Sequence, residues 1–346
     1  HYMTIEKQIG QMLIAGFKGL KIKQSDSIVR DIIKYNIGGV ILYDKDVSDP
    51  NERWRNIQTP EQTKKLINSL QGFGNNNLLI SVDQEGGHVN RLKEEYGFPP
   101  CPSWGEIGSF IDINKTRDFS ENLAATLNDS RFNSNFAPVV DVETTGESYI
   151  SKLGRCFGSD PNNVAEHAYI FITAHEKHGV ATTLKHFPGL GSAVGDTHDG
   201  FTDITSTWSE IELEPYKLLF VSCDVDMVMV GHSFHKGIDP DWPASMSYKT
   251  VTELLRNKLG YNGVVICDDP SMGAISKNYP SEVVMEKMIS AGVDLLCFGN
   301  NLFYDPEIIS KAVKTIYSLV NKGRISKAQI NDSFQRIQKL KAKIKA

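Results

Sequence analysis

The sequence has few of the features that mark membrane, nucleic-acid-binding or disulfide-stabilised proteins. Its five cysteines are widely scattered and include no C-x-x-C pair, so we expect neither a disulfide framework nor a zinc knuckle. No apolar run approaches the ~20 residues that span a bilayer. The formal net charge is −5, and basic residues gather only in the run Lys339, Lys341, Lys343 and Lys345, expected to be a solvated helix end. We therefore expect no nucleic-acid partner and no membrane span.

Length and composition are those of a globular protein. Of the 346 residues, 40% are hydrophobic and 23% are charged, which are ordinary values. At ~150 residues per domain the length suggests two domains, although a (β/α)8 barrel uses ~250 or more as one unit. The first residues show no signal peptide. We expect a monomer in the cytoplasm, or in the periplasm or medium if a leader has been removed.

Eight short apolar runs, separated by amphipathic stretches, predict alternating strands and helices. The runs are Met12–Phe17, Gly39–Tyr43, Leu78–Asp83, Asn135–Asp141, Thr182–His186, Met227–His232, Val264–Asp268 and Asp294–Gly299. Parallel strands need helical crossovers, so this alternation predicts a parallel sheet that helices cover on both faces. Eight units are the number in a closed (β/α)8 barrel, and an open doubly wound sheet is the alternative.

Titratable residues lie at the carboxyl ends of these runs. They are Asp83, Asp141, His186, His232 and Asp268. In a barrel such ends converge on one mouth, whereas in an open sheet they spread along an edge. The pattern favours the barrel. We therefore predict an α/β fold with a single TIM-type barrel domain over residues 1–346 and no second domain, with the extra length in loops.

The segment from Lys185 to Asp199 is the richest in chemically versatile residues. Asp196 and His198 are two residues apart, so in an extended segment their side chains point the same way. A carboxylate beside an imidazole orients the ring and stabilises its protonated form, as a general acid–base requires. A simple loop turn is the alternative interpretation. The glycines of this segment do not fit a dinucleotide-binding loop, which needs a glycine where Val194 stands and must open into a helix.

Asp268 and Asp269 follow the buried run that begins at Val264. A carboxylate held rigidly at the mouth of a barrel suits a nucleophile that attacks an anomeric carbon. Capping of the following loop is the alternative role for either aspartate. We expect Asp268 to be catalytic and Asp269 to be structural.

Two arginines are candidates for ligand binding. Asp83, followed by Gly86-Gly87 and Arg91, forms a polar wall suited to sugar hydroxyls, although the glycines are also compatible with a plain tight turn. Arg155 has two open interpretations, a ligand contact or a surface ion pair. A metal site is not expected, because no HExxH occurs, no H-x-H ends the first strand, and Lys185 beside His186 would repel a cation.

Taken in order, these motifs resemble glycoside hydrolase family 3, in its β-N-acetylglucosaminidase (β-N-acetylhexosaminidase) branch. The matching segments are Ile37–Leu42, Arg55–Ile57, Pro60–Gln62, Asp83–Gly87, Asn135–Val142, Arg155–Pro161, Lys185–Gly189, Asp196–His198, Met229–His232, Pro243–Ser247 and Cys267–Asp269. The D-x-H element marks this branch, since the β-glucosidases of the family place a carboxylate acid–base on a second domain.

The resemblance implies a retaining exo-β-N-acetylglucosaminidase that hydrolyses terminal β-linked GlcNAc, expected to come from peptidoglycan fragments. Asp268 would be the nucleophile that forms a covalent glycosyl-enzyme, and His198, paired with Asp196, would be the acid–base. The residues that would hold the terminal GlcNAc are Asp83, Arg91, Arg155, Lys185, His186 and His232. Neither a metal nor an organic cofactor is implied. The alternatives are a broader β-glycosidase or a GlcNAc phosphorylase of the same family, or a non-catalytic sugar-binding barrel.

The sequence departs from the usual family pattern at a few positions. Leu190 replaces the second histidine of K-H-F-P-G-H-G, and Cys156 stands where serine is common. His88 stands where arginine is common, and Pro270 follows the nucleophile position closely. Leu190 bears on the packing of the loop that contains His198 and on leaving-group preference. The insertion Asp44–Trp54 near the mouth bears on what binds beyond the first sugar.

Overall fold

Eight parallel strands form one sheet that curves into a barrel. The computed structural model describes residues 3–195, 197–198 and 200–345. The strands are β1 (Leu13–Gly16), β2 (Gly39–Ile41), β3 (Leu79–Val82), β4 (Ser134–Asn135), β5 (Thr183–Phe187), β8 (Met227–Val230), β9 (Val264–Cys267) and β10 (Leu295–Phe298). Their order is β4-β3-β2-β1-β10-β9-β8-β5, and single parallel bridges from Ser134 to Ala181 and from Val139 to Lys185 join the two ends. The predicted barrel is confirmed.

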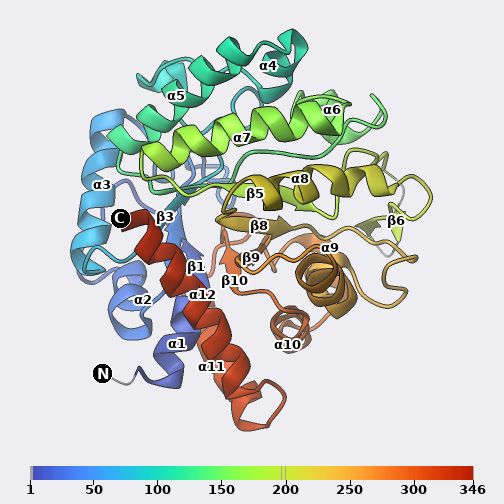
Figure 1. Cartoon of the computed structure of the whole chain (residues 1–346). Helices are drawn as coiled ribbons and strands as arrows, with labels where there is room; N and C mark the ends of the chain where they lie inside the picture. Colours follow the sequence, from blue (N-terminus) through green and yellow to red (C-terminus); the bar gives the residue numbers. More distant parts are fainter. Residues whose placement is uncertain (1–2, 196, 199, 346) are drawn as a thin grey trace.

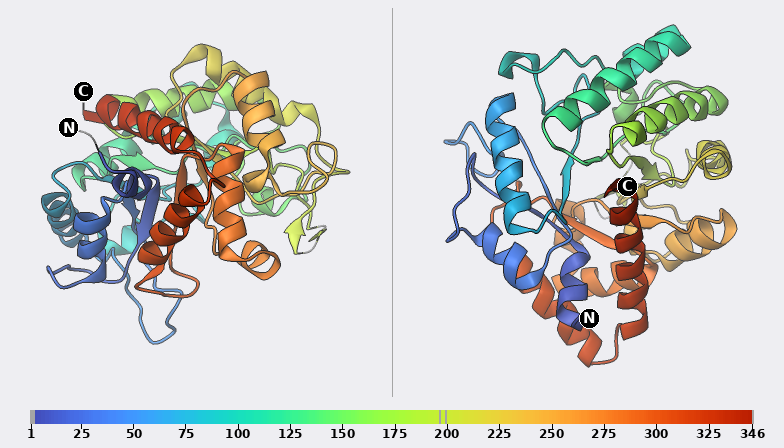
Figure 2. Two further views of the ribbon diagram at one scale, coloured as in Figure 1. Left: turned by 90° about the horizontal axis from the view of Figure 1, so that it is seen from below. Right: turned by 60° about the vertical axis from the view of Figure 1, so that its left-hand side comes forward.

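Helices lie outside the strands and cover the sheet (Figure 1), and Figure 2 shows the same arrangement from two other sides. The α-helices are α1 (Ile5–Gln11), α2 (Ser27–Tyr35), α3 (Pro60–Phe73), α4 (Trp104–Phe110), α5 (Ile113–Asp129), α6 (Tyr149–Lys152), α7 (Pro161–Lys177), α8 (Glu214–Ser222), α9 (Gly273–Asn278), α10 (Ser281–Ala291), α11 (Ile308–Asn321) and α12 (Lys327–Lys345). Shorter 3-10 turns are η1 (Glu94–Tyr96), η2 (Glu210–Leu213) and η3 (Ala244–Met246), and η4 (Lys249–Lys258) is π-helical. A further antiparallel pair, β6 (Thr197–His198) and β7 (Phe201–Thr202), follows β5.

The long helices begin where their capping residues predict. Thr59 accepts a hydrogen bond from the backbone N–H of Gln62, and Pro60 occupies the first turn of α3. Asp160 caps α7 in the same way, ahead of Pro161. One strand is shorter than expected. The run Asn135–Asp141 is strand only at its start, because Pro138 has no N–H with which to continue the ladder.

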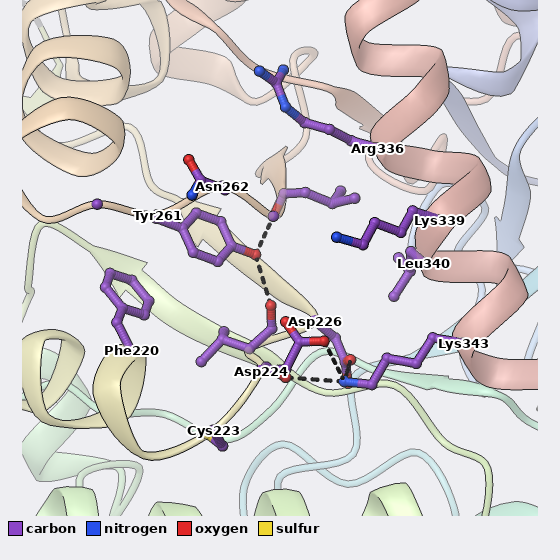
Figure 3. Close-up of a pocket in the computed structure, with 14 residues that line it drawn as sticks. Phe220, Cys223, Asp224, Asp226, Tyr261, Asn262, Arg336, Lys339, Leu340 and Lys343 are labelled. Atoms are coloured by element: carbon purple, nitrogen blue, oxygen red, sulfur yellow. Dashed lines mark hydrogen bonds and ion pairs between the residues drawn. The ribbon is translucent and has the colours of Figure 1, made fainter.

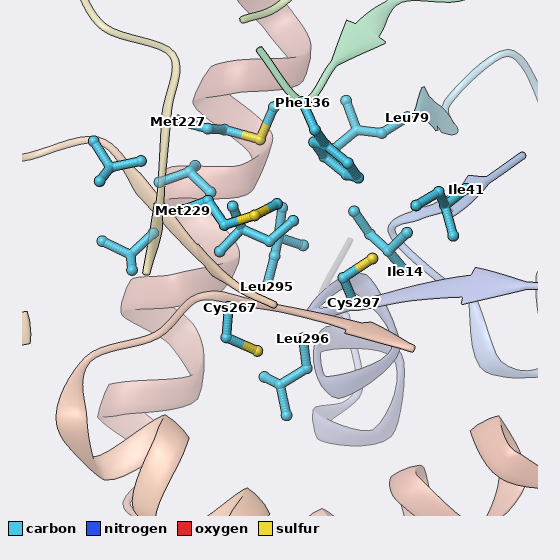
Figure 4. Close-up of a cluster of buried hydrophobic side chains, with 14 of the residues drawn as sticks. Ile14, Ile41, Leu79, Phe136, Met227, Met229, Cys267, Leu295, Leu296 and Cys297 are labelled. Carbon is cyan, nitrogen blue, oxygen red and sulfur yellow. The ribbon is translucent and has the colours of Figure 1, made fainter. Parts of the chain in front are cut away.

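The core consists of apolar side chains from all parts of the sheet. Every residue of β1, β3, β9 and β10 is buried, as continuous apolar runs between two covered faces require. Figure 4 shows part of this core, in which Ile14, Leu79 and Met229 come from three different strands and lie close to Phe136, which directly follows β4. The cysteines are all free thiols, in agreement with the expectation of no disulfide framework.

The end of α12 differs from the expected solvated helix end. Lys341 is only 4% exposed, and its Nζ donates to Gln11 Oε1 at 2.8 Å. Burial lowers the pKa of Lys341 to about 7. Lys343 Nζ contacts Asp226 Oδ1 at 2.7 Å. The expectation was wrong for these two residues, because α12 turns one face inward against α1 and the segment that leads into β8. None of the helices in the described ranges has the length and apolar character needed to cross a bilayer.

Candidate active site

The barrel brings the predicted polar residues to one mouth. Asp83 follows β3, Asp268 follows β9, and His186 lies within β5 near its end. Asp141 lies in the segment after β4, and His232 comes shortly after β8. Because all eight strands are parallel, these ends face the same side of the barrel, where βα loops build active sites.

A buried carboxylate holds two cations on one wall of this mouth. Glu85 is 3% exposed, and its two oxygens accept hydrogen bonds from Arg155 Nε and Nη2, both at 2.9 Å. Lys185 Nζ lies 2.7 Å from Glu85 Oε2 and 3.3 Å from Asp83 Oδ1. Burial would raise the pKa of Glu85, but the charges of Lys185 and Arg155 outweigh it and lower the pKa to about 2.

Of the two interpretations of Arg155, the structure shows an ion pair, and the ligand contact stays a prediction. Its ion pair is not on the surface but inside the site, with a partner that sequence reasoning did not single out. The available signal for Glu85 was its position two residues after Asp83, within a segment already assigned to the site. The fixed ammonium and guanidinium groups present donors to the mouth, and Asp83 presents acceptors. Such a mixture suits the hydroxyl groups of a sugar.

Asp141 fixes the orientation of His186. Asp141 Oδ2 lies 2.8 Å from His186 Nδ1, while Oδ1 accepts from the backbone N–H of His186 at 3.1 Å. A carboxylate only accepts, so Nδ1 holds the ring proton. The other nitrogen, Nε2, then accepts from Arg155 Nη2, which lies 3.4 Å away. The imidazole is therefore part of the same polar wall as Lys185 and Arg155.

Asp268 is an ionised carboxylate with one oxygen available. Its Oδ1 accepts from the backbone N–H of Asp269 at 3.0 Å, and no hydrogen bond within the described ranges reaches Oδ2. Burial would raise the pKa of Asp268, but His232, His186 and the Asp269 N–H have the opposite effect and lower it below its ordinary value. A half-buried, charged carboxylate at a strand end meets the requirements of a nucleophile.

Asp269 has a different environment from its neighbour. Its Oδ1 accepts from the backbone N–H and hydroxyl of Ser271, at 2.8 and 2.6 Å. Its Oδ2 accepts from the Gly299 N–H at 3.1 Å, which ties the loop after β9 to the end of β10. Both carboxylate oxygens therefore accept hydrogen bonds from neighbouring loop residues, in keeping with the structural role expected for Asp269.

His232 lies beside the two aspartates, and both of its nitrogens are occupied. Nε2 lies 3.0 Å from the Asp269 carbonyl oxygen, which only accepts, so Nε2 donates. Nδ1 lies 2.7 Å from Ser245 Oγ, with which it forms a hydrogen bond. The structure therefore places His232 in the site as a support for the loop that contains Asp268, with no ring nitrogen left over for a ligand.

Arg91 has spare hydrogen-bonding capacity. Its backbone N–H donates to Gln84 Oε1 at 2.8 Å, while its buried Nε has no partner among the residues described. The guanidinium lies 5.9 Å from the ring centroid of Tyr43, which follows β2. Burial raises the pKa of Tyr43 well above its usual value, and the nearby Asp83 and Asp269 add to this effect. Tyr43 is a site residue that sequence reasoning did not identify.

The proposed acid–base lies on the hairpin after β5. His198 pairs with Phe201, and Thr197 with Thr202, so the backbone here is extended as predicted. Asp196 lies outside the described residues, and the pairing of Asp196 with His198 stays a prediction. At the root of this loop Leu190 is buried in a small apolar cluster with Ile150, Cys156, Ala193 and Ile204.

A further cavity lies away from this mouth. A cavity of about 320 Å³ lies at the opposite end, before β8 and β9, between α12 and the loop at Tyr261 (Figure 3). Its charged groups Lys343 and Asp226 already pair with each other at 2.7 Å. Within residues 3–195 and 200–345, no group of three or more His, Cys, Asp or Glu side chains is arranged to hold a metal ion.

A (β/α)8 barrel with an ionised carboxylate and sugar-binding donors at its mouth is typical of glycoside hydrolases. Residues 4–340 match the family described as "Glycosyl hydrolase family 3 N terminal domain". The chain therefore belongs to glycosyl hydrolase family 3 and is a glycoside hydrolase, which confirms the resemblance found in the sequence.

Individual relatives agree with this assignment. A "Beta-hexosaminidase" of Tolumonas auensis (strain DSM 9187 / NBRC 110442 / TA 4) is 33% identical over 80% of this chain and 80% of its own length. The solved structure of a family 3 β-N-acetylglucosaminidase from Paenibacillus sp. str. FPU-7 is 30% identical with a TM-score of 0.88. It aligns with 100% of this chain, which spans 64% of the Paenibacillus chain. A β-N-acetylhexosaminidase from Beutenbergia cavernae DSM 12333 is 26% identical with a TM-score of 0.84, over 99% of both chains.

Proposed function

We propose that the protein is a retaining exo-β-N-acetylglucosaminidase that removes terminal β-linked GlcNAc from peptidoglycan fragments. The observation that carries the proposal is the ionised Asp268 carboxylate, which has a free oxygen at the mouth of the barrel. The wall formed by Lys185, Arg155 and Asp83 supports an exo mode, because its donors and acceptors suit the hydroxyls of a terminal sugar. The hexosaminidases among the relatives support the choice of sugar.

The reaction proceeds in two displacements. Asp268 Oδ2 attacks the anomeric carbon while His198, held by Asp196, donates a proton to the departing glycosidic oxygen. The result is a covalent glycosyl-enzyme and a free aglycone. His198 then takes a proton from water, which attacks the same carbon and releases both the sugar and Asp268. Two inversions at one carbon give net retention of configuration.

The remaining residues position the sugar. Arg91, Lys185 and Arg155 donate to its hydroxyls, and Asp83 accepts. His186 Nδ1 donates to Asp141, so only the Nε2 side of the ring, beside Arg155, is left to face the sugar. Glu85 and Asp141 are positioning residues, because they contact these side chains rather than the sugar. Binding energy from the terminal ring can then be used to align the anomeric carbon with Asp268.

The test is hydrolysis of p-nitrophenyl β-GlcNAc without added metal. Asp268→Ala is expected to lower turnover about 10⁴-fold or more, as nucleophile removal does elsewhere. Asp118→Ala, which changes an exposed aspartate on α5, is the matched control and is expected to leave turnover unchanged. A 2-fluoro sugar is expected to label Asp268, identified by peptide mapping. Near-wild-type turnover by Asp268→Ala, or a label on another residue, would contradict the assignment.

The same assay separates the alternatives. A phosphorylase would speed up on addition of inorganic phosphate and release a sugar phosphate. A non-catalytic sugar-binding barrel would bind GlcNAc and release no p-nitrophenol. A broader β-glycosidase would hydrolyse the β-glucoside as fast as the β-GlcNAc substrate.

A further inference from the structure

A buried carboxyl group lies under the start of the loop that leads to His198. Glu212 belongs to the 3-10 turn η2, just before α8, and its side chain is 0% exposed. Its Oε2 accepts from the backbone N–H of Val142 at 3.3 Å. Its Oε1 makes no hydrogen bond of normal geometry with a described residue, although the N–H of Gly191 interacts with the carboxyl group, and no ion pair between described residues includes Glu212. The proposed steps of hydrolysis do not use this buried acid, so its presence must have another reason.

The loop passes directly over this carboxyl. A Cβ atom on Gly189 would lie 2.3 Å from Glu212 Oε2. One on Gly191 would lie 1.5 Å from the Val142 carbonyl oxygen, its closest neighbour, and 2.6 Å from Glu212 Oε1. Real side-chain contacts are never that short, so the backbone approaches Glu212 as closely as only glycine permits. Gly189 and Gly191 therefore pack directly against the carboxyl group of Glu212.

Other contacts hold the residue between these glycines. The Leu190 N–H donates to Asp141 Oδ1 at 3.0 Å, and the Leu190 side chain is buried among Ile150, Cys156, Ala193 and Ile204. Trp208 Nε1 donates to the Pro188 carbonyl at 3.0 Å. Three contacts therefore hold the start of this loop: the hydrogen bond to Asp141, the apolar cluster around Leu190, and the close packing against Glu212.

Glu212 fits this place best as a neutral acid. Burial raises its pKa well above the ordinary value and the charge of Asp141 raises it further, while the N–H groups of Val142 and Gly191 act in the opposite direction. The other titratable groups near it are Tyr216 on α8 and Cys156, and burial raises the pKa of each of them as well. None of these groups supplies a positive charge. A neutral carboxyl can stay beside Asp141 without repelling the carboxylate that orients His186.

We propose that Glu212 is a positioning residue for the loop that leads to His198. Its buried carboxyl holds Gly189–Gly191 in place next to Asp141, and this determines whether His198 can reach the glycosidic oxygen. The proposal rests on the proposed function, because it takes His198 as the acid–base. Glu212 touches neither the sugar nor the leaving group. Its loss loosens the root of the loop, so that His198 less often lies within proton-transfer distance of the glycosidic oxygen.

The test compares leaving groups. The ratio kcat/KM reports the steps up to glycosyl-enzyme formation, and aryl leaving groups of low pKa depart without a proton. Glu212→Ala is expected to lower kcat/KM about 10- to 100-fold for a poor leaving group, the scale of a misplaced catalytic group. It is expected to lower it less than about 3-fold for the 2,4-dinitrophenyl substrate, because that reaction bypasses His198. Glu212→Gln copies the size and neutrality of the acid, and is expected to restore kcat/KM with the poor leaving group.

A merely structural residue would give a different result. Equal losses for both leaving groups, or no loss with the poor one, would overturn the proposal. Should Glu212→Ala fail to fold, Glu212→Asp withdraws the carboxyl by one methylene and takes its place in the same comparison. His198→Ala, measured in parallel, separates the two proposals. If it lacks the leaving-group dependence, the proposed function fails; if it shows the dependence and Glu212 variants do not, only the role of Glu212 fails.

Discussion

Replacing Glu85 by glutamine should cost the protein a substantial part of its stability. The carboxylate is buried between Arg155 and Lys185, and its pKa falls from 4.5 to about 2 in the folded protein. At ~1.4 kcal/mol per pH unit, this drop corresponds to about 3 kcal/mol of free energy of unfolding at neutral pH. Glu85→Gln removes that contribution and takes away the carboxylate that pairs with both Lys185 and Arg155. Breaking a buried ion pair typically costs ~3–5 kcal/mol.

Urea unfolding at pH 7, followed by circular dichroism, measures this loss. The exposed Glu253→Gln is the matched control, and is expected to change the free energy of unfolding by less than about 0.5 kcal/mol. Because the folded pKa is depressed, the contribution of Glu85 is complete above pH 4.5 and disappears as the pH falls toward 2. The gap between wild type and variant should therefore narrow over that window. Equal stability at pH 7, or a gap that stays constant down to pH 2, would refute the reasoning.

Two further changes test buried polar groups, one remote from the site and one within it. Lys341→Met should raise the free energy of unfolding at pH 7 by about 1–3 kcal/mol, because a buried ammonium is replaced by an apolar side chain of similar size. The folded pKa of Lys341, about 7, lies below the ordinary 10.5, so wild-type stability rises with pH between these values and the advantage of the variant should shrink there; a pH-independent difference would contradict this. Asp141→Asn should lower kcat/KM for the aryl β-GlcNAc substrate about 10- to 100-fold, because the amide cannot accept from His186 Nδ1 while keeping the same orientation. An unchanged kcat/KM would show that the orientation of His186 is unimportant.

The fold was predictable because its signal is local. A parallel strand covered on both faces needs a continuous apolar run, and Val264–Cys267 and Leu295–Phe298 have this pattern in the sequence itself. The residues at the strand ends, such as Asp83 and Asp268, could be grouped for the same reason, since the barrel carries all strand ends to one mouth. The early end of β4 was missed although Pro138 was visible, because the apolar run continues past it.

The residues that support the site were harder to predict from the sequence. Glu85 and Arg155 are separated by 70 positions, as are Glu212 and Val142, and Lys341 contacts Gln11 across 330 positions. No periodicity links residues so far apart. A buried glutamate or lysine also contradicts the usual rule that such residues are exposed, so composition assigned Lys341 to the surface. The partners of a buried charge become visible only when the chain is folded.

Two departures from the expected family pattern lie in the same apolar cluster of the folded protein. Leu190 and Cys156 belong to the same apolar cluster, although they are far apart in the sequence. The backbone N–H of Leu190, not its side chain, makes the contact with Asp141. The side chain at this position is therefore free to vary as long as its surroundings match it. Leucine beside cysteine is an apolar pair, and histidine beside serine would be a polar one. The exchange changes which side chains fill the start of the loop that leads to His198, whereas the hydrogen bond to Asp141 and the close approach of Gly189 to Glu212 do not involve the side chain of residue 190.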